Sequence, residues 1–293
     1  MVKQANNELD ALISLIDEPD KEMYLTIREK ISGYGKEAIP RLEEAWLHSE
    51  SSENADRLEH IIDEIRFNDL YHELKSWSDF QHNDLLKAFL LLSKFRFPDM
   101  DEEKYLSEFD QLKQDVWLEI NENLTALEKI KVMNHVLFEI HQFKGQSPKQ
   151  KSPLNTYFIN ELLDSKTGNA LTLGMLYMTI AQQLDIPIFG IDLPDHFVLA
   201  YMDDSMPLKD IEDYMEDEVL FYLNALNKGA VFTQNEIELY LKQMKFEVND
   251  TYFRPCRNKS IIRRLITEMA DTYTLENMPE KADTLNLLLG ALD

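Results

Sequence analysis

The amino-acid sequence predicts an α+β protein that is predominantly helical and contains a small antiparallel sheet. Only 8 of the 293 residues are glycine, against a usual share of about 7%. The many positive-φ turns that a barrel or sandwich needs are therefore not available. Apolar residues recur at spacings of three and four along most of the chain, which is typical of amphipathic helices. Short β-branched and aromatic runs that favour strands lie between residues 186 and 223.

Residues 1–78 are expected to form a helical module. A helix that ends at Gly33-Tyr34-Gly35 is followed by Ile39-Pro40, which begins the next helix. The apolar faces of residues 58–65 and 70–77 predict a third and a fourth helix. This succession resembles HEAT-type helical pairs, although two pairs are too few for a long solenoid.

A helix that is apolar on every side is predicted near the middle of the chain. Residues 167–184 carry no formal charge in a protein that is 29% charged. Residues 170–181 are apolar nearly all round, which is typical of a helix in the centre of a domain. Asn169 is expected to cap the amino terminus of this helix. The polar stretch at residues 144–153 is expected to be a loop.

Strands are predicted after this helix, and helices again at the carboxyl end. Because the strands follow a buried helix and run antiparallel, they indicate an α+β core at residues 79–245. Asn277-Met-Pro279 separates two amphipathic segments, so residues 246–293 are expected to form a tetratricopeptide-like helical hairpin. The predicted strands are residues 186–193, 197–201 and 219–223.

The charge and the cysteine content exclude several classes of partner and cofactor. Thirty basic and 54 acidic side chains give a net charge of −24, which disfavours nucleic acid and membrane surfaces. The single cysteine, Cys256, permits neither an internal disulfide nor a zinc site, and no cofactor is expected. His135 and Glu139 share a helix face, which is a weak metal signal. With no signal peptide and no long apolar segment, a cytoplasmic, soluble protein is predicted.

A buried helix, a strand that begins with histidine and a strand that ends in a polar residue follow one another along the chain. Papain-like and transglutaminase-like cysteine enzymes use this order. A cysteine in the first turn of such a helix lies at the positive end of the helix dipole and loses its proton readily. The histidine takes that proton, and an Asp or Asn on the next strand orients the imidazole.

Residues 168–199 resemble the type-2 transglutaminase-like core family, in its SirB-type bacterial regulator branch. The likeness rests on a helix that starts at Gly168 and ends in Leu184-Asp-Ile-Pro187, on Pro194-Asp-His-Phe197, and on the strand and glycine turn of residues 220–229. It implies a transglutaminase-like, cysteine-protease-like core followed by tetratricopeptide-like helices, over about residues 80–293. Three positions depart from the family pattern: Asp185 and Asp195 stand where glycine is usual, and Ala225 replaces proline.

Carried over position by position, the resemblance implies a degenerate triad. Ala170 stands where an active enzyme has its cysteine, His196 matches the histidine, and Asn224 matches the acid that would orient it. A methyl group cannot attack a carbonyl, so acyl transfer through a thioester is excluded at Ala170. The implied pocket consists of Gly168, Asn169, Ala170, Gly174, Tyr177, His196 and Asn224, with core packing as the other reading for Gly174 and Tyr177.

Three other residues are weighed as a substitute nucleophile. Thr172 is expected to face away from Ala170, and Thr167 lies before the helix, where its hydroxyl would have to approach His196. Cys256 stands between Arg254 and Arg257, whose charges would favour a thiolate. A lone cysteine is more often structural or incidental.

Two functions follow from these observations. The first is a non-catalytic, transglutaminase-like protein, a pseudoenzyme that binds a protein or peptide partner and acts as a regulatory module. Helical-repeat surfaces commonly serve such binding, a step that rests on fold analogy. The alternative is a hydrolase or amidase in which His196 acts as a general base on water without a covalent intermediate.

Overall fold

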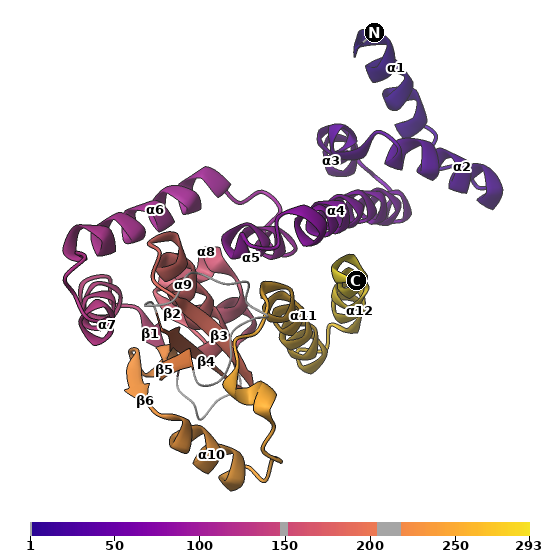
Figure 1. Cartoon of the computed structure of the whole chain (residues 1–293). Coiled ribbons are helices and arrows are strands. Elements are labelled where there is room, and N and C mark those ends of the chain that lie inside the picture. The colour runs from indigo at the N-terminus through magenta and orange to yellow at the C-terminus, as the bar shows by residue number, and fades with distance from the viewer. Residues whose placement is uncertain (1, 147–151, 204–217) are drawn as a thin grey trace. The chain divides into compact units, whose positions relative to one another are not determined.

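The computed structural model describes residues 2–146, 152–203 and 218–293. The chain divides into two compact units, Met1–Lys75 and Ser76–Asp293. Helices predominate and the strands form two small sheets, which confirms the predicted α+β class (Figure 1). None of the helices in these described ranges is both long and apolar enough to cross a membrane. The division into residues 1–78, 79–245 and 246–293 stays a prediction.

The first unit is built from helices around one apolar core. Its core includes Ile31, Leu42 and Ile61, which are fully buried. The two helices predicted at residues 58–65 and 70–77 are one continuous helix, because no glycine or proline interrupts the sequence between them. The helices are α1 (Val2–Ile13), α2 (Lys21–Ser32), α3 (Ile39–Leu47) and α4 (Ser52–Phe80), the last of which extends past Lys75.

The second unit combines helices with a four-stranded antiparallel sheet in the order β3-β4-β5-β6. Its strands are β3 (Ile188–Leu193), β4 (His196–Met202), β5 (Val219–Asn224) and β6 (Ala230–Phe232). Its helices are α5 (Leu85–Lys94), α6 (Glu102–Glu119), α7 (Ala126–Asn134), α8 (Ile159–Ser165), α9 (Ala170–Gln183), α10 (Gln234–Gln243), α11 (Asn258–Leu275) and α12 (Pro279–Leu288).

Helix α9 is the buried central helix that the sequence predicts. All eleven residues from Leu171 to Ala181 are buried, because the helix packs against the sheet and against other helices of its unit. Gly174 lies against the ring of Phe197 and the side chain of Leu199 on β4. The odd-numbered residues of β4 therefore face α9.

The other face of the sheet is covered by α10. Val198, Ala200 and Met202 of β4 form one apolar cluster with Ile237 and Leu241 of α10. Figure 1 shows α9 and α10 on opposite sides of the sheet. Because side chains alternate along a strand, His196 shares the α10 face with Val198, and it pairs across the turn with Leu193 of the same cluster.

Three short strands were not predicted. β6 pairs with the end of β5 and has only three residues, too few to give a periodic signal. β1 (Lys144–Gly145) lies at the start of the loop expected at residues 144–153 and pairs in parallel with β2 (Thr167–Gly168). A side chain at Gly145 would meet the carbonyl oxygen of Leu226 at 2.5 Å, so glycine is needed for this close approach.

Candidate functional site

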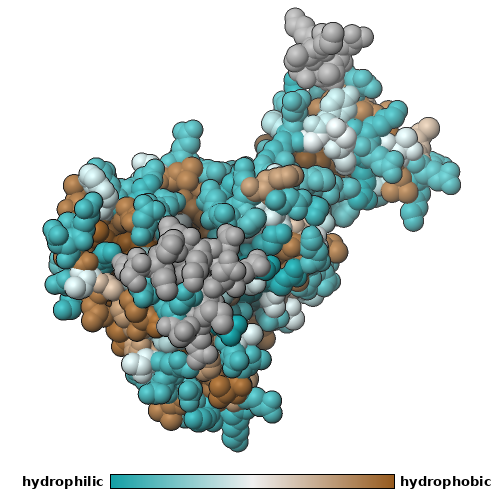
Figure 2. All heavy atoms as spheres, in the orientation of Figure 1, coloured by the Kyte–Doolittle hydropathy of each residue, from teal (hydrophilic) through white to brown (hydrophobic). Residues whose placement is uncertain are grey.

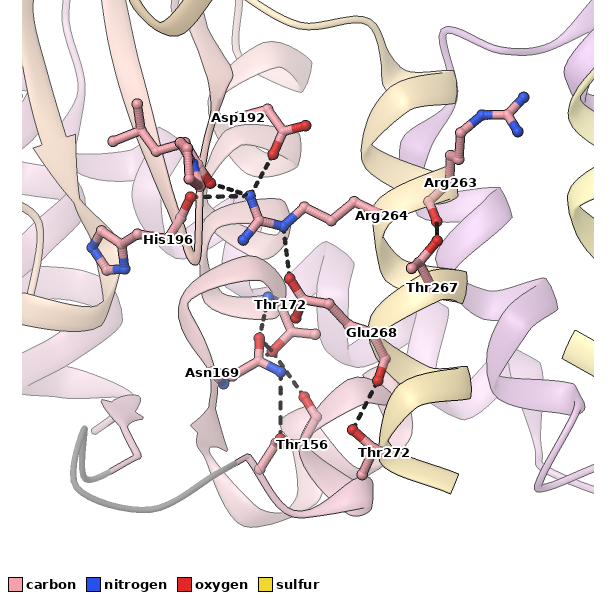
Figure 3. A network of polar contacts seen from close by, with 12 residues as sticks. Thr156, Asn169, Thr172, Asp192, His196, Arg263, Arg264, Thr267, Glu268 and Thr272 are labelled. Atoms are coloured by element: carbon pink, nitrogen blue, oxygen red, sulfur yellow. Dashed lines mark hydrogen bonds and ion pairs between the residues drawn. The ribbon is translucent and has the colours of Figure 1, made fainter. Parts of the chain in front are cut away.

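The first turn of α9 is held by a network of buried polar groups (Figure 3). Oδ1 of Asn169 accepts a hydrogen bond from the backbone N–H of Thr172 at 2.9 Å, and Oγ1 of Thr172 accepts from the Asn169 N–H at 3.2 Å. This reciprocal pair is a capping box, which confirms Asn169 as the cap. The Thr172 hydroxyl donates to the carbonyl of Thr156 at 2.9 Å. It is fully buried and occupied by this structural contact, so it is not available as a nucleophile.

Ala170 is the first residue of α9 and is partly exposed. The backbone at this position has the setting in which a cysteine would be activated, yet the side chain is a methyl group. Thr167, the residue before Gly168, uses its hydroxyl to donate to the carbonyl of Ser165 at 3.1 Å. No described contact joins that hydroxyl to His196.

Three residues of the predicted pocket are packed in the core. Methyl groups added at Gly168 or Gly174 would come within 2.8 or 2.7 Å of neighbouring side chains. Tyr177 is 1% exposed, and its hydroxyl donates to Oδ1 of Asn134 at 3.0 Å. Of the two readings open for Gly174 and Tyr177, the structure therefore places both in core packing.

His196 and Asn224 are brought into contact by the sheet. His196 begins β4 and Asn224 ends β5, and Nδ2 of Asn224 lies 3.3 Å from Nε2 of His196. Oδ1 of Asn224 accepts from the backbone N–H of Asn227 at 3.2 Å, which fixes the amide with its nitrogen toward the ring. An amide nitrogen can only donate, so Nε2 is the acceptor and the neutral imidazole carries its proton on Nδ1.

The surroundings of His196 favour the neutral ring. Burial lowers the pKa of His196, and the positive charge of Arg264 lowers it further. Arg264 donates from Nη1 to the backbone carbonyls of Leu193 at 2.9 Å and His196 at 3.0 Å. The imidazole ring of His196 points away from this guanidinium (Figure 3). The guanidinium is paired with Asp192 and, through Nε at 2.6 Å, with Glu268.

His196 and Asn224 line a cavity of about 490 Å³ on the α10 face of the sheet. The cavity is bordered by Asp195 of the β3–β4 turn, by β6 and by Tyr240 of α10. Of the described residues, none from α9 lines it. The sequence reasoning did not find Tyr240, Arg264 or β6, since no spacing in the chain connects them with His196.

Two turns, one of which borders this cavity at Asp195, have a backbone conformation that glycine favours. Asp185 and Asp195, which stand where the family pattern has glycine, both have a φ of 55°. Asp is one of the few other residues that tolerate this region. The departures from the pattern therefore preserve the backbone while adding a carboxylate at the Asp195 turn.

Cys256 contacts β3 through its backbone, and its surroundings do not favour the thiolate that was weighed as an alternative to a structural or incidental cysteine. Its backbone N–H donates to the carbonyl of Gly190 in β3 at 2.8 Å. Burial and the nearby Asp192 raise the pKa of the thiol to about 12, against the opposing effect of Arg264. The charges of Arg254 and Arg257 do not offset the cost of burying the thiolate.

His135 and Glu139 form an exposed pair, with Nδ1 of His135 2.8 Å from Oε2 of Glu139. Within the described ranges, no third potential metal ligand joins this pair, and no other group of three such side chains occurs.

A buried helix that leads into antiparallel strands, with a His–Asn pair at one end of those strands, defines a cysteine-protease-like core. The chain belongs to the transglutaminase-like superfamily, whose sequence profile matches residues 103–267. The finer assignment to the SirB-type branch stays a prediction.

Curated relatives match this chain over part of its length. Human F-box only protein 21 is 28% identical over 163 residues, which are 54% of this chain and 24% of that protein. A UPF0162 protein of Xylella fastidiosa (strain 9a5c) is 22% identical over 204 residues, or 68% of each chain. UPF0162 protein BU173 of Buchnera aphidicola is 23% identical over 214 residues, which are 71% of this chain and 72% of that protein. The chain thus spans about a quarter of F-box only protein 21. No solved structure matches.

Proposed function

We propose that this chain is a non-catalytic, transglutaminase-like binding module that holds a peptide segment of a protein partner. The proposal rests on one combination of residues: the position of the nucleophile holds Ala170, and the histidine of the triad, His196, accepts a hydrogen bond from Asn224. A transglutaminase-like enzyme needs a thiol at the first position and a proton acceptor at the second.

The orientation of the Asn224 amide argues against general-base catalysis by His196. A general base needs a nitrogen lone pair that faces the reacting proton. In His196 the lone pair of Nε2 is engaged by the Asn224 amide, and Nδ1 carries the ring proton. A hydrolase that activates water through this imidazole would have to break that contact first.

The cavity beside His196 supports binding. Its volume of about 490 Å³ falls within the range of ligand sites. Val231 of β6 is 44% exposed at its border, and Leu193, Val198 and Ile237 form an apolar floor. An apolar floor with a few polar groups at the border suits a peptide side chain. The regulatory role that we attach to this binding rests on fold analogy.

Turnover and binding assays on the full chain test the proposal. We expect a panel of fluorogenic amide and ester substrates to be hydrolysed no faster by the wild type than by His196→Ala. We also expect a displayed random-peptide library to yield ligands that bind the wild type and are lost with Val231→Arg, which places a bulky positive charge at the border of the cavity. Asn286→Arg, on the exposed face of α12, is the control and should retain them. Hydrolysis that disappears in His196→Ala would establish the hydrolase instead.

A further inference from the structure

We infer that the cavity beside His196 takes a cationic side chain, arginine or lysine, from the bound peptide. This inference rests on the proposed function and adds the chemical class of the ligand. Three features carry it: the charge of the lining, the aromatic walls, and the apolar surface that a long cationic side chain would cover.

The lining carries negative charge and no positive charge among the described residues. Asp195 and Glu236 line the cavity, and none of its lining residues is Lys or Arg. Glu236 is occupied at the start of α10, where it accepts from the Thr233 N–H at 2.8 Å. Asp195 is exposed and makes no ion pair within the described ranges, so its carboxylate is available to a ligand.

Two cations of the described residues, Arg264 and Lys228, lie outside the lining and do not neutralise the cavity. Arg264 lies behind the β3–β4 turn, outside the lining, and its charge is balanced by Asp192 and Glu268. Lys228 follows Asn227 on the turn after β5 but is not part of the lining. In a protein with a net charge of −24, an anionic ligand would be repelled from this cavity.

Aromatic rings line the cavity together with the Asp195 carboxylate. The rings of His196 and Tyr240 lie 6.0 Å apart, and Phe232 of β6 lines the same cavity. The Tyr240 hydroxyl donates to the carbonyl of Pro194 at 2.8 Å, which holds this ring beside the Asp195 turn. A guanidinium or ammonium group is attracted both to ring faces and to a carboxylate.

Apolar surface beside the rings suits the aliphatic part of such a side chain. Val231 and Ile237 line the cavity next to Phe232. The face of the second unit seen in Figure 2 is mostly hydrophilic and carries apolar patches near β6. Lys and Arg cover apolar surface with their methylene groups while the charged end reaches a polar partner.

Methyl NMR of the full chain tests this inference with two probes of equal shape. N-acetyl-arginine methylamide carries the cation, and N-acetyl-citrulline methylamide is its neutral counterpart. We expect the arginine probe to shift the methyl resonances of Val231 and Ile237 and to bind about five-fold or more tightly than the citrulline probe. Asp195→Asn should remove this preference. Asp271→Asn, which removes an exposed carboxylate at a different cavity, should retain it.

Each outcome decides the inference. Equal binding of the two probes, an arginine preference that survives Asp195→Asn, or absence of shifts at Val231 with the arginine probe would overturn it. If library peptides without a basic residue still bind and are lost with Val231→Arg, the cationic specificity fails while the binding module stands. If the library yields no ligand and His196-dependent hydrolysis is found, the proposed function itself fails.

Discussion

The amide nitrogen of Asn224 lies 3.3 Å from Nε2 of His196 and donates to it. In an active triad the third residue accepts a hydrogen bond from the imidazole and stabilises its charged form. Here the amide oxygen of Asn224 is held by the Asn227 N–H at 3.2 Å, so the polarity of the contact is reversed. The pair therefore stabilises a neutral ring.

Replacing Asn224 with Asp is expected to raise the pKa of His196 by about one unit or more, because a carboxylate within hydrogen-bond distance favours the imidazolium. NMR titration of the His196 ring resonances measures this shift. Asn286→Asp adds the same charge at an exposed position of α12 and should leave the titration of His196 unchanged. An unchanged pKa in Asn224→Asp would show that the two side chains are not in contact in solution.

The stability of the second unit should increase with pH in one window. Burial and Arg264 lower the pKa of His196 below its ordinary 6.5 in the folded chain. Between the lowered pKa of the folded chain and the ordinary pKa of the unfolded chain, the unfolded chain binds more protons than the folded chain. The free energy of unfolding therefore rises with pH in this window, and the stabilising contribution of the neutral His196 is lost as the pH falls. Urea unfolding measured from pH 5 to 8 gives the free energy of unfolding at each pH. In His196→Gln the part of its pH dependence that comes from His196 should be absent. His135→Gln changes an exposed histidine and is the matched control.

Arg264 should stabilise the β3–β4 turn far more than its neighbour Arg263. The Arg264 side chain is 15% exposed and bonds two carbonyls and two carboxylates, so Arg264→Met leaves several polar groups unpaired. We expect a loss of about 2–4 kcal/mol in the free energy of unfolding. Arg263 is 47% exposed and pairs with Asp293, so Arg263→Met should cost about 1 kcal/mol or less. Equal losses in denaturant unfolding would contradict the role of the Arg264 network.

Replacing Gly229 with any other residue should lower the free energy of unfolding strongly. It has a φ of +68°, and an added methyl group would overlap the Asn134 side chain, which donates to the Gly229 carbonyl at 3.1 Å. Gly229→Ala is therefore expected to cost about 2 kcal/mol or more. Gly35 has a similar φ of +60° with nothing within 4 Å, so Gly35→Ala reports the backbone strain without the clash. Hydrogen exchange can follow the unit that carries each change, and a smaller cost at Gly229 than at Gly35 would refute the clash.

Cys256 should be slow to alkylate. With its pKa raised to about 12, almost none of the thiol is ionised near pH 8. We expect iodoacetamide to react about 100-fold or more slowly with the native chain than with the urea-unfolded chain. Mass spectrometry measures both rates. Cys256→Ser should leave peptide binding unchanged, whereas fast native alkylation would restore the thiol as a candidate reactive group.

Patterns that depend on neighbours along the chain predicted their structures well. An uncharged run that is apolar all round predicted helix α9. The place of Asn169 just before that run predicted that it caps the helix. Both depend on local chemistry. The break expected within α4 was wrong because separate apolar faces do not by themselves end a helix when neither glycine nor proline lies between them.

The sequence by itself determined the α+β class, the central helix, and the absence of a thiol at Ala170, since composition, periodicity and side-chain identity are properties of the chain. Only the tertiary structure decided that Asn224 donates to His196, that burial keeps the Cys256 thiol protonated by raising its pKa, and that Asp195 and Tyr240 border one cavity. Hydrogen-bond polarity, solvation and cavity walls depend on groups far apart in sequence, and folding alone brings those groups together.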